Sequence, residues 1–446
     1  MIASRSIVFL AVFVFGIAAT IKRPFYGLLL YVILVYVDPS TKWWGSVFIP
    51  LRVSLVTAIV IFLSYFLNRE KEGIPGRPVL LNKLMILFLG SIIISTILGK
   101  VILQANIDNI VIRYAKYIVL FFLITKVVKT KKDYDLLLWA NIVGCLYLGV
   151  QAYIGAGHYE NGRLEGIGGS GFQESEGVAA YICVVLPFLL DRYFAPSKKP
   201  WLTKASVLLC TAFILRLLVA TKTRAAFLAI LIMSLLLVIR MWKLGNVYKY
   251  IFVFVVGIAG MIYLADDHYW DRIGTIFSQS EALVDSNKGE VTEERIDVWA
   301  AGVRIMLENP MTGIGPGNFL IFGHEYLPDI DRKIAAHNMF VLTGSENGIP
   351  GLVILLGIVG STLFLLRNIR SKQMVSLEDK SIHDSSVFLE LSFIGFIVNG
   401  FFVNAIYFEV FFWLCGMAVA LHNISHYHKH QELLIRLLEE QETCHA

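Results

Sequence analysis

The chain has 446 residues, a mean hydropathy of +0.67 and a formal charge of +5. Hydrophobic residues make up 57% and charged residues 16%, whereas roughly 25% of residues are charged in soluble domains. This composition excludes a soluble globular protein. Because apolar runs near twenty residues recur, the sequence predicts an all-α polytopic integral membrane protein. The alternating ten-residue segments typical of a membrane β-barrel are absent from the sequence.

Thirteen apolar segments are candidate membrane helices. They are residues 7–21, 26–37, 51–67, 84–103, 110–128, 136–154, 178–190, 205–220, 225–239, 250–264, 338–366, 387–402 and 406–421. Several are too short to cross a bilayer unaided, so about twelve spans are predicted. The first two leave two alternatives: two full spans with the N-terminus outside, or one span and a half-buried helix with the N-terminus inside.

Basic loops indicate which ends of these helices face the cytoplasm. Lys and Arg gather in residues 69–83, 126–132, 192–204, 240–249 and 367–372, which alternate along the chain as cytoplasmic loops should. The N-terminal apolar run is followed by Lys22 and Arg23 and then by more apolar sequence. It is therefore predicted to be a retained span rather than a cleaved signal peptide.

The same pattern divides the chain into four regions. Residues 1–265 are predicted to form an N-terminal bundle of transmembrane helices, and residues 266–336 a large loop on the outer side that contains helices. Residues 337–421 are C-terminal transmembrane helices, and residues 422–446 are a cytoplasmic tail. The large loop holds thirteen acidic and six basic residues, a formal charge of −7, which favours the non-cytoplasmic side.

Two shorter segments on the outer side carry polar candidates. Residues 155–177 are rich in glycine, which predicts an irregular segment. Arg163 either contacts a polar ligand there or belongs to a plain connector. Lys222 and Arg224 lie at an outer turn, against the usual placement of cations. They either bind a phosphate or extend toward lipid headgroups.

A helix is predicted to begin near Thr292 within the large loop, and Asn309-Pro310 stops it. Arg295 lies in its first turn, where the helix dipole disfavours a cation. It either pairs with the neighbouring glutamates or binds an anion at the helix N-terminus. The glycines at 313, 315 and 317 predict a tight turn, since no Lys-Ser/Thr follows them as in a nucleotide-binding loop.

His337 follows this loop directly, and an apolar segment begins at Asn338. Arginine side chains suit phosphate because their planar donors bind two oxygens at once, and histidine can accept a proton near neutral pH. The outer-side candidates are Lys222, Arg224, Arg295 and His337, with His158, Arg163, His268 and His324 behind them. Together they fit group transfer from a lipid diphosphate to a hydroxyl acceptor. No metal site is indicated by the spacing of the ligand-type residues.

These residues also carry a resemblance to a known family. The motifs are 223–226, 294–299, 309–317, 337–338 and 347–351. Over roughly residues 155–421 the chain resembles the O-antigen ligase family, which shares a domain with O-antigen polymerases and O-linked oligosaccharyltransferases. The N-terminal part, with Arg23-Pro24 and Asp38-Pro39, is similar to a subgroup of O-glycosylation ligases.

The resemblance implies a glycosyltransferase of the GT-C type in the bacterial inner membrane, with its active site on the periplasmic face. It implies transfer of a glycan from undecaprenyl diphosphate to a sugar hydroxyl of lipid A-core, in lipopolysaccharide biosynthesis. It implies inversion at the anomeric carbon, no metal, no cofactor and no nucleic-acid partner. By this resemblance His337 would be the base, and Arg224 and Arg295 would bind the diphosphate. From their own positions in the sequence, Lys222, Arg163, Asn338 and His324 are predicted to bind substrate.

Three alternatives stay open. An O-antigen polymerase would use a lipid-linked glycan as acceptor, and a protein O-oligosaccharyltransferase would use a protein. A transporter of lipid-linked glycans would need internal repeats and charges within the spans, for which mainly Arg216 and Glu409 are candidates.

Overall fold

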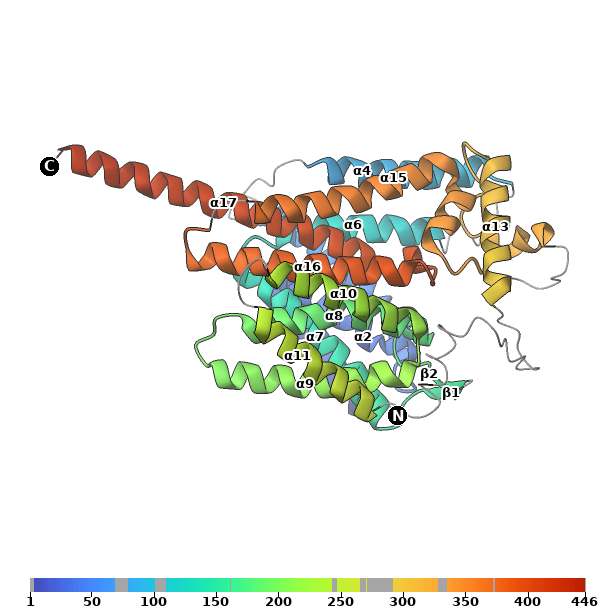
Figure 1. Ribbon diagram of the computed structural model, residues 1–446, viewed down its shortest axis with the longest axis horizontal. Coiled ribbons are helices and arrows are strands. Elements are labelled where there is room, and N and C mark those ends of the chain that lie inside the picture. The colour runs from blue at the N-terminus through green and yellow to red at the C-terminus, as the bar shows by residue number, and fades with distance from the viewer. Residues whose placement is uncertain are drawn as a thin grey trace.

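The computed structural model describes residues 4–68, 79–100, 110–160, 162–242, 247–264, 270, 292–327, 335–371 and 374–445. Long helices run side by side along the molecule, and α13 (Thr292–Glu308) lies across one end of them (Figure 1). Among the described residues, eight helices have the length and apolar composition of a membrane span. The prediction of an all-α polytopic membrane protein is confirmed, while the number of about twelve spans and the GT-C type stay predictions.

The helices follow the predicted apolar segments closely. They are α1 (Ser4–Lys22), α2 (Pro24–Val37), α3 (Val53–Leu67), α4 (Leu80–Leu98), α6 (Ile112–Val127), α7 (Lys131–Tyr153), α8 (Ser175–Phe194), α9 (Pro200–Thr221), α10 (Arg224–Trp242), α11 (Val247–Leu264), α15 (Met339–Arg370), α16 (Leu377–Gly400) and α17 (Val410–His445). Short elements lie between them: η1 (Pro39–Thr41), η2 (Ser46–Phe48), η5 (Ser170–Phe172), α14 (Phe319–Phe322), η6 (Gly323–Tyr326) and η7 (Ala405–Tyr407). The backbone of α17 continues through residue 422, where a separate tail was predicted to begin.

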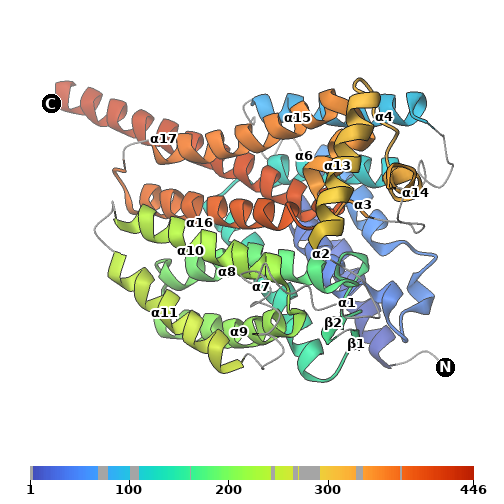
Figure 2. The ribbon, with the colours of Figure 1, turned by 45° about the vertical axis from the view of Figure 1, so that its right-hand side comes forward.

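The N-terminal segment is a helical hairpin. The Ser6 hydroxyl of α1 donates to the Trp44 carbonyl, 2.7 Å away, beyond the end of α2. At the other end, Arg23 pairs with Asp133 at the start of α7 at 2.8 Å. The start of α1 therefore lies at the end of the bundle where α13 lies (Figure 2), and the pairing with Asp133 places Arg23 at the opposite end. This arrangement agrees with the alternative of two full helices.

Ion pairs gather basic residues at the end of the bundle opposite α13. Arg192 at the end of α8 pairs with Asp135 of α7 at 2.9 Å. Arg240 of α10 and Arg370 of α15 both bind Glu390 of α16, at 3.3 and 2.8 Å. The described parts of several predicted basic loops therefore share one end, which we call the basic end.

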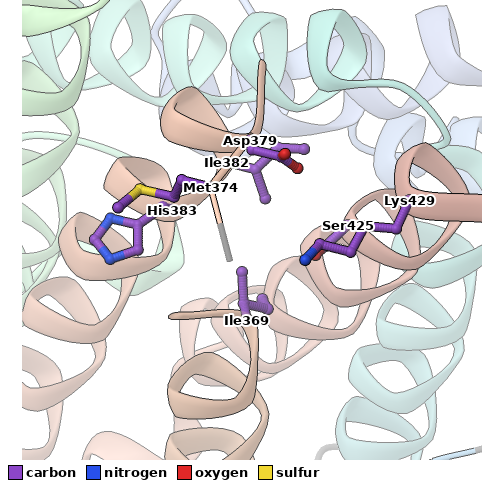
Figure 3. Close-up of a pocket in the computed structure, with 7 residues that line it drawn as sticks. All are labelled: Ile369, Met374, Asp379, Ile382, His383, Ser425 and Lys429. Carbon is purple, nitrogen blue, oxygen red and sulfur yellow. The ribbon is translucent and has the colours of Figure 1, made fainter. Parts of the chain in front are cut away.

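A small cavity also opens at the basic end, between the end of α15, the start of α16 and the middle of α17 (Figure 3). Its lining residues are Ile369, Met374, Asp379, Ile382, His383, Ser425 and Lys429. The carboxylate of Asp379 is already bonded to the Val375 and Ser376 backbone N–H groups at the start of α16. The cavity therefore lies away from the predicted outer site and next to a helix cap.

The turn after α13 is bonded to a break in α15. Gly348 has φ 69° and ψ −174°, which interrupts the helix one residue before Ile349. The Ile349 N–H donates to the Pro310 carbonyl at 2.8 Å, and the Ile314 N–H donates to the Ser345 carbonyl at 2.9 Å. The predicted tight turn is confirmed, because the glycines at 313, 315 and 317 all have positive φ.

A buried carboxylate completes this junction. Glu346 is 2% exposed and accepts hydrogen bonds from the backbone N–H groups of Gly317 at 2.8 Å and Phe319 at 3.3 Å. Its other oxygen accepts from the Tyr407 hydroxyl at 2.8 Å. Since a buried carboxylate needs such partners, Glu346 fixes the turn, α15 and η7 relative to one another. The first part of α15, which begins after His337, is thereby held in place.

Candidate functional site

The backbone around His337 is fixed on both sides. The Asn338 side chain caps α15, because its Oδ1 accepts from the Phe340 and Val341 N–H groups at 2.9 and 3.1 Å. On the other side, Trp299 Nε1 of α13 donates to the Ala336 carbonyl at 3.1 Å. His337 itself has φ 46°, a left-handed conformation that is costly for a residue other than glycine and is often found at functional sites.

The His337 side chain faces a carboxylate in the first turn of α8. Its Nδ1 lies 3.7 Å from Glu176 Oε2, and the imidazole side chain is 30% exposed. Glu176 Oε1 lies 3.3 Å from Arg163 Nη1. The Glu176 and Arg163 side chains are only 11% and 14% exposed, and Arg295 of α13 also interacts electrostatically with Glu176. We call His337, Glu176, Arg163 and Arg295 the outer cluster.

A short hairpin positions Arg163. β1 (His158–Glu160) and β2 (Arg163–Glu165) pair antiparallel, with His158 opposite Glu165. Glu165 then accepts a hydrogen bond from the Ser175 backbone N–H at 2.6 Å, which ties β2 to the start of α8. The prediction of an irregular segment is wrong for these two strands, which pair although local propensity assigns the glycine-rich sequence to a loop. Most of the other described residues between 155 and 177 have no regular structure, as predicted.

A second acidic side chain lies at the edge of the outer cluster. Glu174 precedes α8 and interacts electrostatically with Glu176, His337 and Glu165. Partial burial raises its pKa, the negative charge of Glu176 raises it further, and His337 opposes this shift. The outer cluster therefore contains both carboxylates and basic side chains, and more than one of these groups can bind a proton.

The other predicted residues lie at the same end of the bundle but have different surroundings. Lys222 adopts φ 47° in the turn between α9 and α10, and its Nζ lies near Gly162 of the hairpin. Arg224 begins α10 and is half-buried. The Asn338 side-chain oxygen is bonded within the helix cap, so what remains for substrate is its amide nitrogen.

Among the described residues, His324 has no hydrogen bond or ion pair to the outer cluster. It lies in η6, where its neighbour Glu325 pairs with Lys100, just beyond α4, at 2.5 Å. In Figure 2, α14, which leads into η6, lies to the right of α13, whereas the β-hairpin lies near the bottom of the view, below α13. The candidate His268 lies outside the described residues.

Sequence reasoning missed Glu176. Two glutamates next to a helix start are usually explained by the helix dipole, which favours negative charge there. The available signal was position: Glu176 follows the glycine-rich segment that also supplies Arg163. The contact with His337 joins residues 161 positions apart, so no local pattern indicates it.

The fold and the outer cluster define a polytopic membrane protein with a polar, ionisable site at one end of its helices. Residues 208–356 match the family described as O-antigen ligase, and residues 4–197 match a family of unknown function. No curated protein matches the chain at a significant level. The chain therefore carries the O-antigen ligase domain, and the resemblance to that family is confirmed. Proteins of this family are membrane enzymes of the glycosyltransferase kind, either ligases or polymerases.

The two matched regions both contribute to the outer cluster. The O-antigen ligase match includes Lys222, Arg224, Arg295, His324, His337 and Asn338. Arg163 and Glu176 belong instead to the region that matches the family of unknown function. The cluster is thus assembled across the boundary between the two matches.

Proposed function

We propose that the protein is an O-antigen ligase that transfers a glycan from undecaprenyl diphosphate to a sugar hydroxyl of lipid A-core. The observation that carries this proposal is the placement of His337 and Arg163 against Glu176, with the charge of Arg295 nearby, within a chain that carries the ligase domain. An imidazole next to fixed guanidinium groups supplies a base for a hydroxyl and positive charge for a diphosphate.

The proposed reaction is a single displacement. His337 turns Nδ1 toward Glu176, so Nε2 is the ring nitrogen left to face an acceptor hydroxyl. As the hydroxyl oxygen forms its bond to the anomeric carbon, its proton passes to Nε2. The bond between that carbon and the diphosphate oxygen breaks, and its electron pair leaves with the diphosphate. Attack from the opposite face inverts the anomeric configuration.

Arg295, Arg224 and Lys222 are the residues proposed to bind the departing diphosphate. Negative charge develops on that group as its bond breaks, and fixed cations stabilise it. Arginine holds two phosphate oxygens in one plane, which also orients the leaving group. Because these side chains can supply the required charge, we propose that the reaction needs no metal ion.

The proposed site faces the periplasm from the inner membrane. This orientation is supported by the basic end, since Lys and Arg accumulate on the cytoplasmic side and the outer cluster lies at the opposite end. The lipid-linked donor would then present its diphosphate at the outer headgroup level, beneath α13.

The test is glycan transfer by purified protein in detergent, with a chelator present. The donor is a synthetic undecaprenyl-diphosphate glycan, and the acceptor is a lipid A-core fraction. Wild type is compared with His337→Ala, Arg295→Ala and the control Arg304→Ala, which changes an exposed arginine on the same helix. We expect inversion and transfer by wild type and by the Arg304 variant, and loss of transfer by the other two in folded protein.

Other outcomes separate the alternatives. Elongation of the donor without modification of the core would identify a polymerase, and transfer to a protein acceptor would identify an O-oligosaccharyltransferase. Transfer that survives His337→Ala would remove the proposed base. Movement of the lipid-linked glycan across a proteoliposome membrane without any transfer would favour the transporter.

A further inference from the structure

We propose that Glu176 is a positioning residue for His337: it fixes the imidazole with Nδ1 toward its carboxylate and stabilises the imidazolium that forms when Nε2 takes the acceptor proton. This role rests on the proposed function for its catalytic consequence, but the interaction itself can be tested without catalysis. It assigns a partner to the base that neither the sequence motifs nor the family match provides.

The first argument is the geometry of the pair. Glu176 Oε2 and His337 Nδ1 are 3.7 Å apart, which is longer than a hydrogen bond. Catalytic hydrogen bonds are often long in the absence of substrate and shorten when charge develops. Protonation at Nε2 would make the ring a cation, and the attraction to Glu176 would then draw Nδ1–H onto Oε2.

The second argument is that the carboxylate is itself fixed. Arg163 Nη1 lies 3.3 Å from Oε1, so the two oxygens face different partners. The first turn of α8 is held by the bond from the Ser175 N–H to Glu165. Because both side chains of the Glu176–Arg163 pair are largely buried, the carboxylate has little freedom to turn away from His337.

The third argument is the charge around the pair. The groups that face it are Glu174 before α8, Glu165 and Arg163 on β2, and Arg295 on α13. His337 acts most strongly on Glu176, followed by Arg163 and Arg295, and the positive charges of all three favour the ionised carboxylate. An ionised carboxylate is the form that can stabilise an imidazolium.

The test compares Glu176→Gln with wild type by two independent measurements. The first follows modification of His337 by diethyl pyrocarbonate, read by mass spectrometry across pH, because only the neutral imidazole reacts. Removing the anion withdraws stabilisation from the protonated ring. We therefore expect half-maximal modification at a lower pH in Glu176→Gln. The same midpoint in both proteins would overturn the proposal.

The second measurement is the transfer assay. Losing one hydrogen bond to a charged group should lower kcat roughly tenfold to hundredfold with little change in KM for the acceptor. The acid side of the rate–pH profile should shift to lower pH in the same variant. Asp297→Asn is the control: it removes an exposed carboxylate of α13 to which no role in the site is assigned, and it should change kcat by less than about threefold.

Two further variants exclude a merely structural role. Glu176→Asp keeps the charge on a shorter side chain and should recover part of kcat. Arg163→Gln combined with Glu176→Gln removes both members of the buried ion pair. If Glu176 only neutralised Arg163, the double variant would regain activity; a positioning role predicts that it stays as slow as Glu176→Gln. If Glu176→Gln shifts the pH of His337 modification but wild type transfers no glycan, the interaction between Glu176 and His337 is supported and the proposed ligase function is refuted.

Discussion

Gly348→Ala is the most direct test of how the site is held. Gly348 has φ 69° and ψ −174°, a region that residues with a side chain almost never occupy. A Cβ added there would lie 2.7 Å from the Pro310 carbonyl oxygen and 2.8 Å from the Met311 carbonyl carbon. Both are backbone atoms of the turn after α13, so neither can rotate away as a side chain would.

The expected cost combines two effects. Holding a non-glycine residue in this conformation costs about 1–3 kcal/mol, and the overlap with the turn adds a similar amount. A loss of roughly 4 kcal/mol in unfolding free energy is therefore expected. The break in α15 would relax by moving the turn or the helix start, and either movement would displace the segment that precedes α15.

The assay is thermal inactivation of purified protein in detergent, followed as loss of monodisperse protein and as loss of transfer activity. Gly360→Ala is the matched control, because the same helix has open space at that position. We expect a fall of several degrees in the apparent midpoint for Gly348→Ala and no fall for Gly360→Ala. Equal midpoints for the two variants would show that the junction between the turn and α15 is not needed for the fold.

Three further predictions concern neighbours of the site. Trp299→Phe removes the donor to the buried Ala336 carbonyl and should lower the free energy of unfolding by about 1–3 kcal/mol, measured by thermal unfolding. It should also lower kcat for transfer. Asn338→Ala should lower the free energy of unfolding by about 1 kcal/mol, whereas Asn338→Asp keeps an oxygen that can cap α15. If Asn338→Asp is as stable as wild type but transfers no glycan, the Asn338 amide group binds substrate. The hydrogen bond to Glu308 raises the pKa of Tyr326 to about 12, so the folded protein keeps a proton that the unfolded chain releases above about pH 10. The free energy of unfolding should therefore fall as the pH rises from about 10 to about 12. Unfolding midpoints measured across this pH range should fall less in Tyr326→Phe than in wild type.

The helices could be predicted from sequence because apolar length is a local property. Each predicted segment depends only on consecutive residues, and the positions of His337, Arg295 and Arg163 outside or at the ends of helices followed from the same pattern. The chemistry of the side chains reduced the number of candidate site residues, since guanidinium groups suit phosphate binding and imidazole groups suit proton transfer. Their proximity is a property of the tertiary structure, which local sequence patterns do not predict.

Buried acids were the hardest to predict. Glu346 lies within a predicted apolar segment and is not among the candidate site residues, yet its carboxylate binds the turn after α13. Glu409 is a candidate for a charge used in transport, but its carboxylate accepts a hydrogen bond from the Tyr31 hydroxyl at 3.0 Å. Arg216 lies 5.0 Å from the ring of Tyr153. The partners come from distant parts of the chain, so sequence alone shows a charge in an apolar span and not what satisfies it.

The N-terminal hairpin shows the same limit. Its orientation depends on contacts made by Ser6 and Arg23 at opposite ends of α1, and both partners lie beyond α2 in sequence. A segment of 14 residues such as α2 is ambiguous by length, because it is shorter than the roughly 20 residues of a typical span. Packing against α1, α3 and α7 decides that it runs as a helix alongside them.

The division of the outer cluster between the two matched regions has a consequence for how the enzyme is built. The proposed base His337 and the cation Arg295 come from the ligase domain, whereas Glu176 and Arg163 come from the preceding region. If the carboxylate positions the base, then neither region holds a complete site alone. The preceding region would then contribute directly to the rate, beyond anchoring the chain in the membrane. A chimaera that keeps residues 208–356 but replaces the glycine-rich segment and the start of α8 should fold and bind donor, yet transfer at about the rate of Glu176→Gln.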